Sequence, residues 1–150
     1  MPDPGLATRA TREPLRVAAL AGLVLAGAAA GLNLVWNFDI FWHLAGGEWM
    51  FRHARVLGAD PFTIDPQPEW VNVHWLFQVL VTAVHAIGGF AALSVLKALL
   101  AAGMMLAFAL ATRRVTTAWA VVAGLLTLTV EAGRISVRPE AVTLIMVTVE

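Results

Sequence analysis

Residues 17–43 read VAALAGLVLAGAAAGLNLVW, then NF, then DIFWH, and this stretch decides the fold. Val17 to Trp36 forms an apolar run of about 20 residues, the length needed to cross the hydrocarbon core of a bilayer, and only Asn33 interrupts it. The run from Asp39 to His43 then places a carboxylate and an imidazole among aromatic side chains, where a membrane helix would leave the lipid. This position suits chemistry on a lipid-linked head group whose tail stays in the bilayer.

The same stretch has an alternative interpretation as a signal peptide. Arg9, Arg12 and Arg16 would form its basic n-region, and Ala28-Ala29-Ala30 would supply an Ala-x-Ala cleavage site. We favour a membrane anchor, because the apolar run continues past that site to Trp36 and is longer than the core of a usual signal peptide.

The composition of the whole chain is that of a membrane protein. Of its 150 residues, 59% are hydrophobic and 13% are charged, whereas a typical soluble domain carries about 25% charged residues. The formal net charge is zero, so no global field attracts nucleic acid, and the lack of cysteine excludes disulfides and thiolate chemistry. Six tryptophans without any tyrosine fit an interfacial aromatic belt.

The pattern along the chain predicts an all-α fold, a polytopic membrane helical bundle with three complete spans plus the start of a fourth. The expected order is a cytoplasmic tail at residues 1–14, a span at 17–36, an external loop at 37–89, spans at 90–111 and 115–131, and the start of a further span at 140–150. We interpret the chain as the N-terminal part of a longer protein and expect it to be inactive alone.

The external loop is expected to hold two juxtamembrane helices, of which the first follows Asp39. At 100° per residue, Asp39, His43 and Gly46 share one face of that helix, whereas Glu48 and Arg52 form an i,i+4 ion pair on the opposite face. Gly46 beside Asp39 and His43 would leave room for a close approach.

Residues 71–87 carry a one-sided polar stripe, because His74, Gln78, Thr82 and His85 fall within about 80° on a helical wheel. Such a stripe is typical of a helix that lies at the membrane interface or faces a cavity.

The orientation of the chain depends on whether residues 71–87 span the bilayer or lie along its surface. If they span it, Arg113-Arg114 lie outside; if they lie on the surface, these arginines and those near the N-terminus are all cytoplasmic. We favour the surface arrangement with a cytoplasmic N-terminus, because it obeys the positive-inside rule.

Several motifs together resemble a known group of membrane enzymes. The motifs are DIFWHLAGGEWM at 39–50, ADPFT at 59–63, WVNVHWLFQVL at 70–80, the pair Gly88-Gly89 and VRPEAVTL at 137–144. They resemble a bacterial branch of the integral-membrane glycosyltransferases of the C-type (GT-C) fold, a group that includes the protein mannosyltransferases and aminoarabinose transferases. The resemblance covers residues 33–149.

The resemblance implies a multi-pass enzyme of the bacterial cytoplasmic membrane. It would transfer a hexosyl or pentosyl unit from a polyprenyl-phosphate donor to a glycan, lipid or protein acceptor on the outer face. An acid in the first external loop serves as catalytic base or metal ligand in that group, and Asp39 is the matching position. Phe38 and Ile40 flank Asp39, so the two adjacent acids that some members carry are missing here. The resemblance leaves a divalent metal ion open as a cofactor and assigns no ligands to it. The lysine-proline-proline element of aminoarabinose transferases is replaced by residues 70–72, Trp-Val-Asn.

The catalytic candidates Asp39 and His43 each have a structural interpretation beside the functional one. Asp39 would act as a general base on an acceptor hydroxyl, or would serve as the N-cap of the following helix. His43, one turn later, would orient the Asp39 carboxylate or join it on a metal ion, or would simply pack among Trp42 and Trp49.

The candidates for substrate or phosphate binding are His74, Gln78, Arg134 and Arg138. His74 and Gln78 would line a groove for a sugar or head group, or would form the wet face of a surface helix. Arg134 and Arg138 have the i,i+4 spacing that would hold the phosphate of the donor, or they would pair with acids in their own loop. Lys97, inside an expected span, is predicted to extend its ammonium group outward to the interface.

Two other functions compete with the transferase. A transporter or lipid-handling protein also carries polar groups within the membrane, and a non-catalytic membrane scaffold would need Asp39 and His43 for structure alone. The chain contains no Gly-x-x-x-x-Gly-Lys, His-Glu-x-x-His or Gly-x-Ser-x-Gly motif, so it gives no support to a nucleotide-driven pump, a zinc peptidase or a serine hydrolase.

Overall fold

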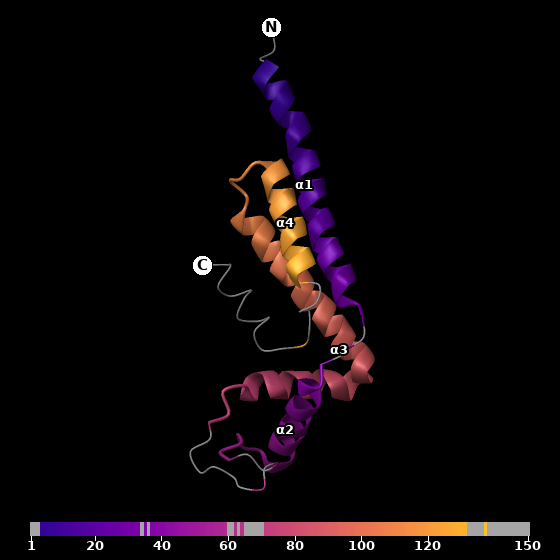
Figure 1. The fold of residues 1–150 in the computed structure, drawn as a ribbon, viewed down its shortest axis with the longest axis vertical. Coiled ribbons are helices and arrows are strands. Elements are labelled where there is room, and N and C mark those ends of the chain that lie inside the picture. Colours follow the sequence, from indigo (N-terminus) through magenta and orange to yellow (C-terminus); the bar gives the residue numbers. More distant parts are fainter. Residues whose placement is uncertain are drawn as a thin grey trace.

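The computed structural model describes residues 4–33, 35, 37–59, 62, 64, 71–131 and 137. This part of the chain forms four helices (Figure 1), which are α1 (Pro4–Gly31), α2 (Asp39–His53), α3 (Trp75–Ala111) and α4 (Thr117–Glu131).

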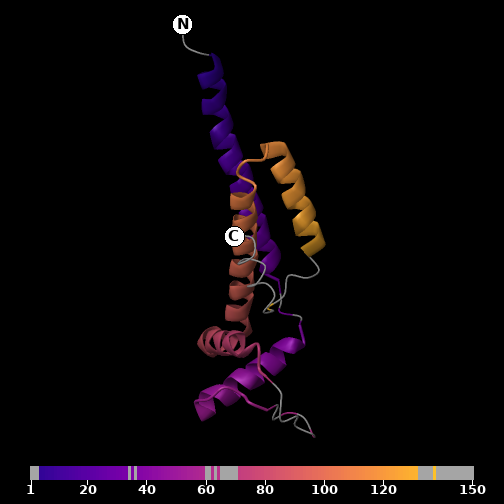
Figure 2. The same cartoon turned by 90° about the vertical axis from the view of Figure 1, so that its left-hand side faces the viewer.

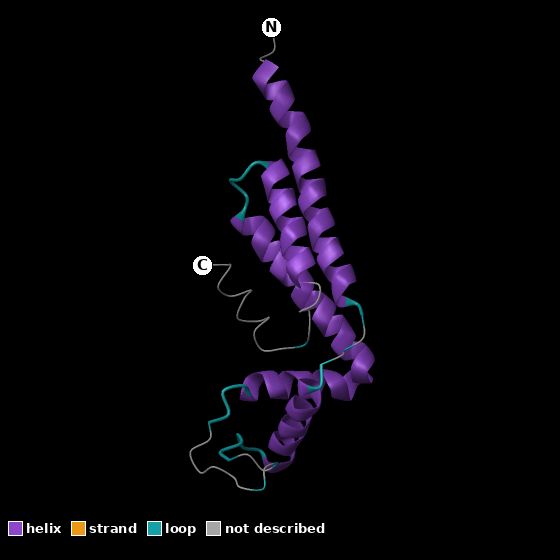
Figure 3. Cartoon of the chain, viewed as in Figure 1, coloured by secondary structure: helices purple, strands orange, loops and turns teal. Residues whose placement is uncertain are grey.

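The helices are arranged in two groups. α1, the C-terminal part of α3 and α4 run lengthwise beside one another, while α2 and the N-terminal part of α3 lie across one end of them (Figures 1 and 2). Every regular element in the described ranges is a helix (Figure 3). The all-α prediction is therefore confirmed for these residues.

α3 bends at Gly88 and Gly89, which separate a first limb, Trp75–Ile87, from a second limb, Phe90–Ala111. Gly89 has φ 60° and ψ −148°, a conformation that only glycine adopts without strain. A straight helix of 37 residues would be about 55 Å long, well beyond a bilayer core of about 30 Å. The bend leaves the second limb at about 33 Å.

Small residues allow α1 to pack closely on the second limb of α3. A Cβ atom on Gly31 would lie 2.5 Å from the Cα of Ala98, and one on Gly27 would lie 2.7 Å from the Cγ of Met105. Such spacing of small residues four positions apart is common where membrane helices pack without a hydrophobic driving force. α1 ends at Gly31 because Asn33 folds back, and its side-chain amide donates to the carbonyl of Ala30 (3.0 Å).

Two candidate membrane spans are present among the described residues, so the prediction of a polytopic bundle with three complete spans plus the start of a fourth is wrong. On length and apolar composition, Glu13–Gly31 and Trp75–Ala111 qualify. α4 has 15 residues and is about 22 Å long, which is too short to cross about 30 Å of hydrocarbon. The segment at 140–150, expected to begin a fourth span, lies outside the described residues.

The helices also begin and end at other residues than expected. α1 starts at Pro4, inside the segment expected to be a polar tail. The helix expected at 71–87 is not separate but is the first limb of α3, continuous through the bend with the second limb.

The main hydrophobic cluster lies at this bend. Ile40 from α2, Phe77 and Val81 from the first limb, Leu93 from the second limb, and Val137 are all buried there. The cluster fixes the transverse pair of helices to the lengthwise group.

Candidate functional site at a helix crossing

α2 crosses the first limb of α3 in very close contact, and we call this contact the seam. The face of α2 that carries His43, Gly46 and Met50 is buried in it. His43 and Gly46 share this face, as the helical wheel predicted, whereas Asp39, which was expected on it, is exposed. A Cβ atom on Gly47 would lie 2.1 Å from the hydroxyl oxygen of Thr82 and 2.5 Å from the carbonyl oxygen of Gln78. Glycine is therefore required at this position.

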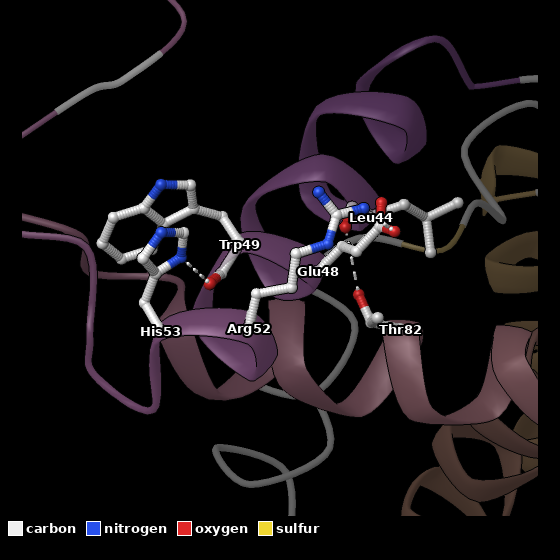
Figure 4. Close-up of polar contacts among 6 residues, drawn as sticks. All are labelled: Leu44, Glu48, Trp49, Arg52, His53 and Thr82. Carbon is white, nitrogen blue, oxygen red and sulfur yellow. Dashed lines mark hydrogen bonds and ion pairs between the residues drawn. The ribbon is translucent and has the colours of Figure 1, made fainter.

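The hydroxyl of Thr82 bonds across the seam to α2, whereas Asn72 bonds to Gln78 on the same side of the seam. The amide of Asn72 donates to Oε1 of Gln78 (2.7 Å), and the hydroxyl of Thr82 donates to the carbonyl of Leu44 (3.3 Å; Figure 4). Gln78 is completely buried, and its Nε2 has no hydrogen-bond partner among the described residues. Gln78 is thus buried between the helices. It therefore does not form part of the wet face of a surface helix, which was one of its two interpretations.

His43 is buried at the same crossing among aromatic rings. Its ring centroid lies 5.1 Å from that of Phe77, 5.5 Å from that of Trp42 and 6.0 Å from that of His74. His74 is half-buried and immediately precedes α3. The structure therefore brings His43, His74 and Gln78 together at one seam.

Asp39 is the first residue of α2, and its side chain is exposed rather than buried with that of His43. The structure does not use it as the N-cap residue, which is Phe38. Instead, the backbone N–H of Asp39 donates to the side-chain oxygen of Asn37 (3.1 Å). Asp39 is therefore an exposed acidic residue at the start of a helix whose opposite face is buried.

The opposite face of α2 carries charge. Glu48 and Arg52 form the predicted ion pair on the surface (Figure 4). The ring of His53 stacks on that of Trp49 at a centroid distance of 4.1 Å, and the guanidinium carbon of Arg55 lies 5.2 Å from the Trp49 ring centroid. Arg55 follows the end of α2. We call the surface formed by Glu48 and Arg52 the charged face of α2.

Lys97 does not extend outward to the interface, contrary to the prediction. It is 2% exposed, and its ammonium group donates a hydrogen bond to the side-chain oxygen of Asn33. Because Asn33 in turn donates to Ala30, Lys97 ties the end of α1 to α3. The signal for this contact was the single amide in the run 17–36, Asn33, and the single charge in the run 90–111, Lys97, which sequence reasoning treated separately.

Arg134 and Arg138, the predicted phosphate ligands, lie outside the described residues. Among the residues with a described position, no group of three or more His, Cys, Asp or Glu side chains is arranged to hold a metal ion.

No protein-family model, curated protein or solved structure matches this chain. What the site can do therefore follows from its own residues: an exposed carboxylate begins α2, and a sealed polar seam holds α2 in place.

Proposed function

We propose that this protein acts as a membrane glycosyltransferase in which Asp39 is the general base. Asp39 would accept the proton of an acceptor hydroxyl while the hydroxyl oxygen attacks the anomeric carbon of a polyprenyl-phosphate-linked sugar. The bond between that carbon and the phosphate oxygen breaks, and polyprenyl phosphate leaves. The resemblance of the loop motifs to GT-C enzymes supplies the reaction class.

The exposure of Asp39 at the start of α2 is the observation that carries the proposal. Figures 1 and 2 show α2 across the end of the lengthwise helices, close to where α1 ends. A carboxylate there would meet a sugar head group at the lipid surface while the polyprenyl tail stays beside the candidate spans. The seam supports this role, because a catalytic group on a packed helix is held more precisely than one on a loop.

The other candidate residues have different relations to this site. His43, one turn from Asp39, supports the first turn of α2 from its buried side. His74 is half-buried and is the seam residue that a head group would reach, whereas Gln78 would act from within the seam. Binding of the donor phosphate by Arg134 and Arg138, and a divalent metal ion near Asp39, remain predictions from the sequence.

The test is the Asp39→Asn substitution in the complete protein, expressed in its own cell. Release of polyprenyl phosphate is measured from a panel of lipid-linked sugars, and membrane insertion and donor binding are measured in parallel. We expect turnover to fall by about 10²–10⁴-fold, the usual contribution of a placed general base, with insertion and donor binding retained.

The matched control is Glu48→Gln, which neutralises an exposed acid on the charged face of α2 and should leave turnover unchanged. Unchanged turnover in Asp39→Asn would remove Asp39 from the mechanism. A wild-type protein that releases no polyprenyl phosphate from any donor would contradict the transferase and favour a transporter or scaffold.

A further inference from the structure

Three arginines gather at the end of the molecule that is remote from α2. One candidate span begins there at Glu13 and the other ends there at Ala111. Arg16 belongs to α1, and Arg113 and Arg114 belong to the connection between α3 and α4 (Figure 1). We call Arg16, Arg113 and Arg114 the arginine corner.

Arg16 holds the corner in a fixed arrangement. Its guanidinium group donates to the carbonyl of Thr112 (2.9 Å) and to that of Val115 (2.9 Å). These two residues flank Arg113 and Arg114 in the chain, so the bonds attach the whole connection to α1. The side chains of Arg113 and Arg114 are exposed, and none of the described acidic side chains forms an ion pair with either of them. The corner therefore presents two guanidinium groups to its surroundings.

Positive charge is in excess around the corner. Glu13 is the one acidic residue in the sequence of α1. The connection at 112–116 reads TRRVT and contains no acid, and the first turn of α4 contains none either. Guanidinium groups form charge-assisted hydrogen bonds with carboxylate and phosphate oxygens. The ligand that suits this corner is therefore an anion.

An exposed apolar strip adjoins the arginines. Leu106 and Leu110, in the last two turns of the second limb of α3, are 51% and 56% exposed. Their spacing of four residues places them on one face of the helix, and Arg113 and Arg114 follow within the next four residues. A soluble anion would use the arginines alone, whereas an amphiphile with an anionic head would use the arginines and the leucines together.

The height of the corner along the molecule also favours a lipid. The two candidate spans both reach this end, so the arginines lie at the level of the lipid head groups. Trp119, in the first turn of α4, is 70% exposed at the same end, and tryptophan is enriched where a membrane protein meets the boundary between lipid and water. Basic residues that adjoin a spanning helix attract anionic phospholipids.

We propose that the arginine corner binds an anionic phospholipid. Arg113 and Arg114 contact the phosphate diester of its head group, and Leu106 and Leu110 contact its acyl chains. Arg16 is a positioning residue, because its hydrogen bonds hold the connection that carries the other two arginines. The site is at the opposite end of the molecule from Asp39 and does not depend on the chemistry proposed there.

The test measures the binding of three soluble probes to the complete protein in a neutral detergent. Dioctanoyl phosphatidylglycerol is the anionic lipid, and dioctanoyl phosphatidylcholine has the same chains without net charge. Glycerophosphoglycerol is the anionic head group without chains. The wild type is compared with Arg113→Gln/Arg114→Gln. The matched control, Arg52→Gln/Arg55→Gln, removes two arginines near the other end of the molecule.

We expect the wild type and the matched control to bind phosphatidylglycerol about 5–30-fold more tightly than phosphatidylcholine, the effect of one or two arginines at an anionic lipid. Arg113→Gln/Arg114→Gln should bind the two lipids equally, with an unchanged circular dichroism spectrum. A wild type without preference, or a preference that persists in this variant, would overturn the proposal. Glycerophosphoglycerol that binds as tightly as the lipid would also overturn it, because the site would then take a soluble anion.

A second measurement needs no variant. Raising the salt concentration from about 0.1 M to about 1 M shortens the screening length from about 10 Å to about 3 Å. The preference of the wild type for phosphatidylglycerol should then fall toward onefold. A preference that is the same at both salt concentrations would show that the charges of the arginine corner do not select the lipid, and the proposal would be wrong.

Discussion

Gly47 is the residue at which α2 and the first limb of α3 come closest. The space that a side chain would need is occupied by the hydroxyl of Thr82 and the backbone carbonyl of Gln78. A different rotamer of Thr82 would move the hydroxyl away. The carbonyl of Gln78 belongs to the backbone of α3, so it moves only if the two helices separate.

We predict that Gly47→Ala destabilises the protein by about 1–3 kcal/mol, the usual cost of overpacking a close contact. The control is Gly22→Ala in α1, where a Cβ atom meets nothing within 4 Å, so the higher helix propensity of alanine acts alone and stabilises by up to about 1 kcal/mol. Thermal unfolding in detergent, followed by circular dichroism, compares the two variants. Equal unfolding temperatures for both would contradict the close contact at Gly47.

Local spacing was enough to predict some residues of the site but not others. The Glu48–Arg52 ion pair and the shared face of His43 and Gly46 depend on one helix only, so the sequence predicted them. The burial of Gln78 depends on which element covers the polar stripe, and a helical wheel does not contain that information. The contact of Lys97 with Asn33 joins residues 64 positions apart, and neither residue alone indicates the other.

The bend in α3 is the feature of a single element that shapes the molecule most. Gly88-Gly89 was predicted as the end of a segment, and it is the point at which one helix changes direction. The number of spans was predicted wrongly, because apolar composition at 115–131 was counted as a span although α4 has 15 residues. Composition identifies an apolar helix, whereas helix length decides whether it crosses a bilayer.

We predict that Gly89→Ala disturbs this bend, because alanine is strained at φ 60° and ψ −148° by about 1–3 kcal/mol. The angle between the two limbs is followed with a nitroxide label in each limb, at Leu80→Cys and Leu106→Cys. Pulsed electron resonance measures the distance between the two labels, which depends on that angle. In the Gly89→Ala background we expect the distance to increase toward about 39 Å, the value for a straight helix.

Gly58→Ala is the control for the bend, since a Cβ atom there also meets nothing within 4 Å but the backbone of Gly58 is outside the positive-φ region. It should leave the distance between the labels unchanged. A Gly89→Ala protein with the unaltered distance and stability would show that the bend does not depend on glycine.

The whole molecule has two chemically different ends. At the end where α3 connects to α4, the guanidinium group of Arg16 donates to the carbonyls of Thr112 and Val115 (2.9 Å each), beside the exposed Arg113 and Arg114. At the other end lie Asp39 and the charged face of α2. α1 and the second limb of α3 run between the two ends (Figure 1).

We predict that the arginine-rich end is cytoplasmic, because short loops rich in Arg and Lys stay on that side of a membrane. A membrane-impermeant maleimide should label Arg52→Cys in intact cells and Arg114→Cys only after the membrane is permeabilised. Labelling of both variants after permeabilisation is the control for thiol reactivity. The reverse pattern in intact cells would contradict the proposed orientation of Asp39 toward the outer face.

The seam also sets a condition on how the protein is made. α2 leaves the ribosome before the helix that covers its glycine face, since Leu44 and its partner Thr82 are 38 residues apart. At about 5–20 residues per second, the interval between them is about 2–8 s. During that interval α2 emerges with Gly46, Gly47 and His43 uncovered, so the nascent chain passes through a stage in which chaperones or the insertion machinery can bind this face before α3 does.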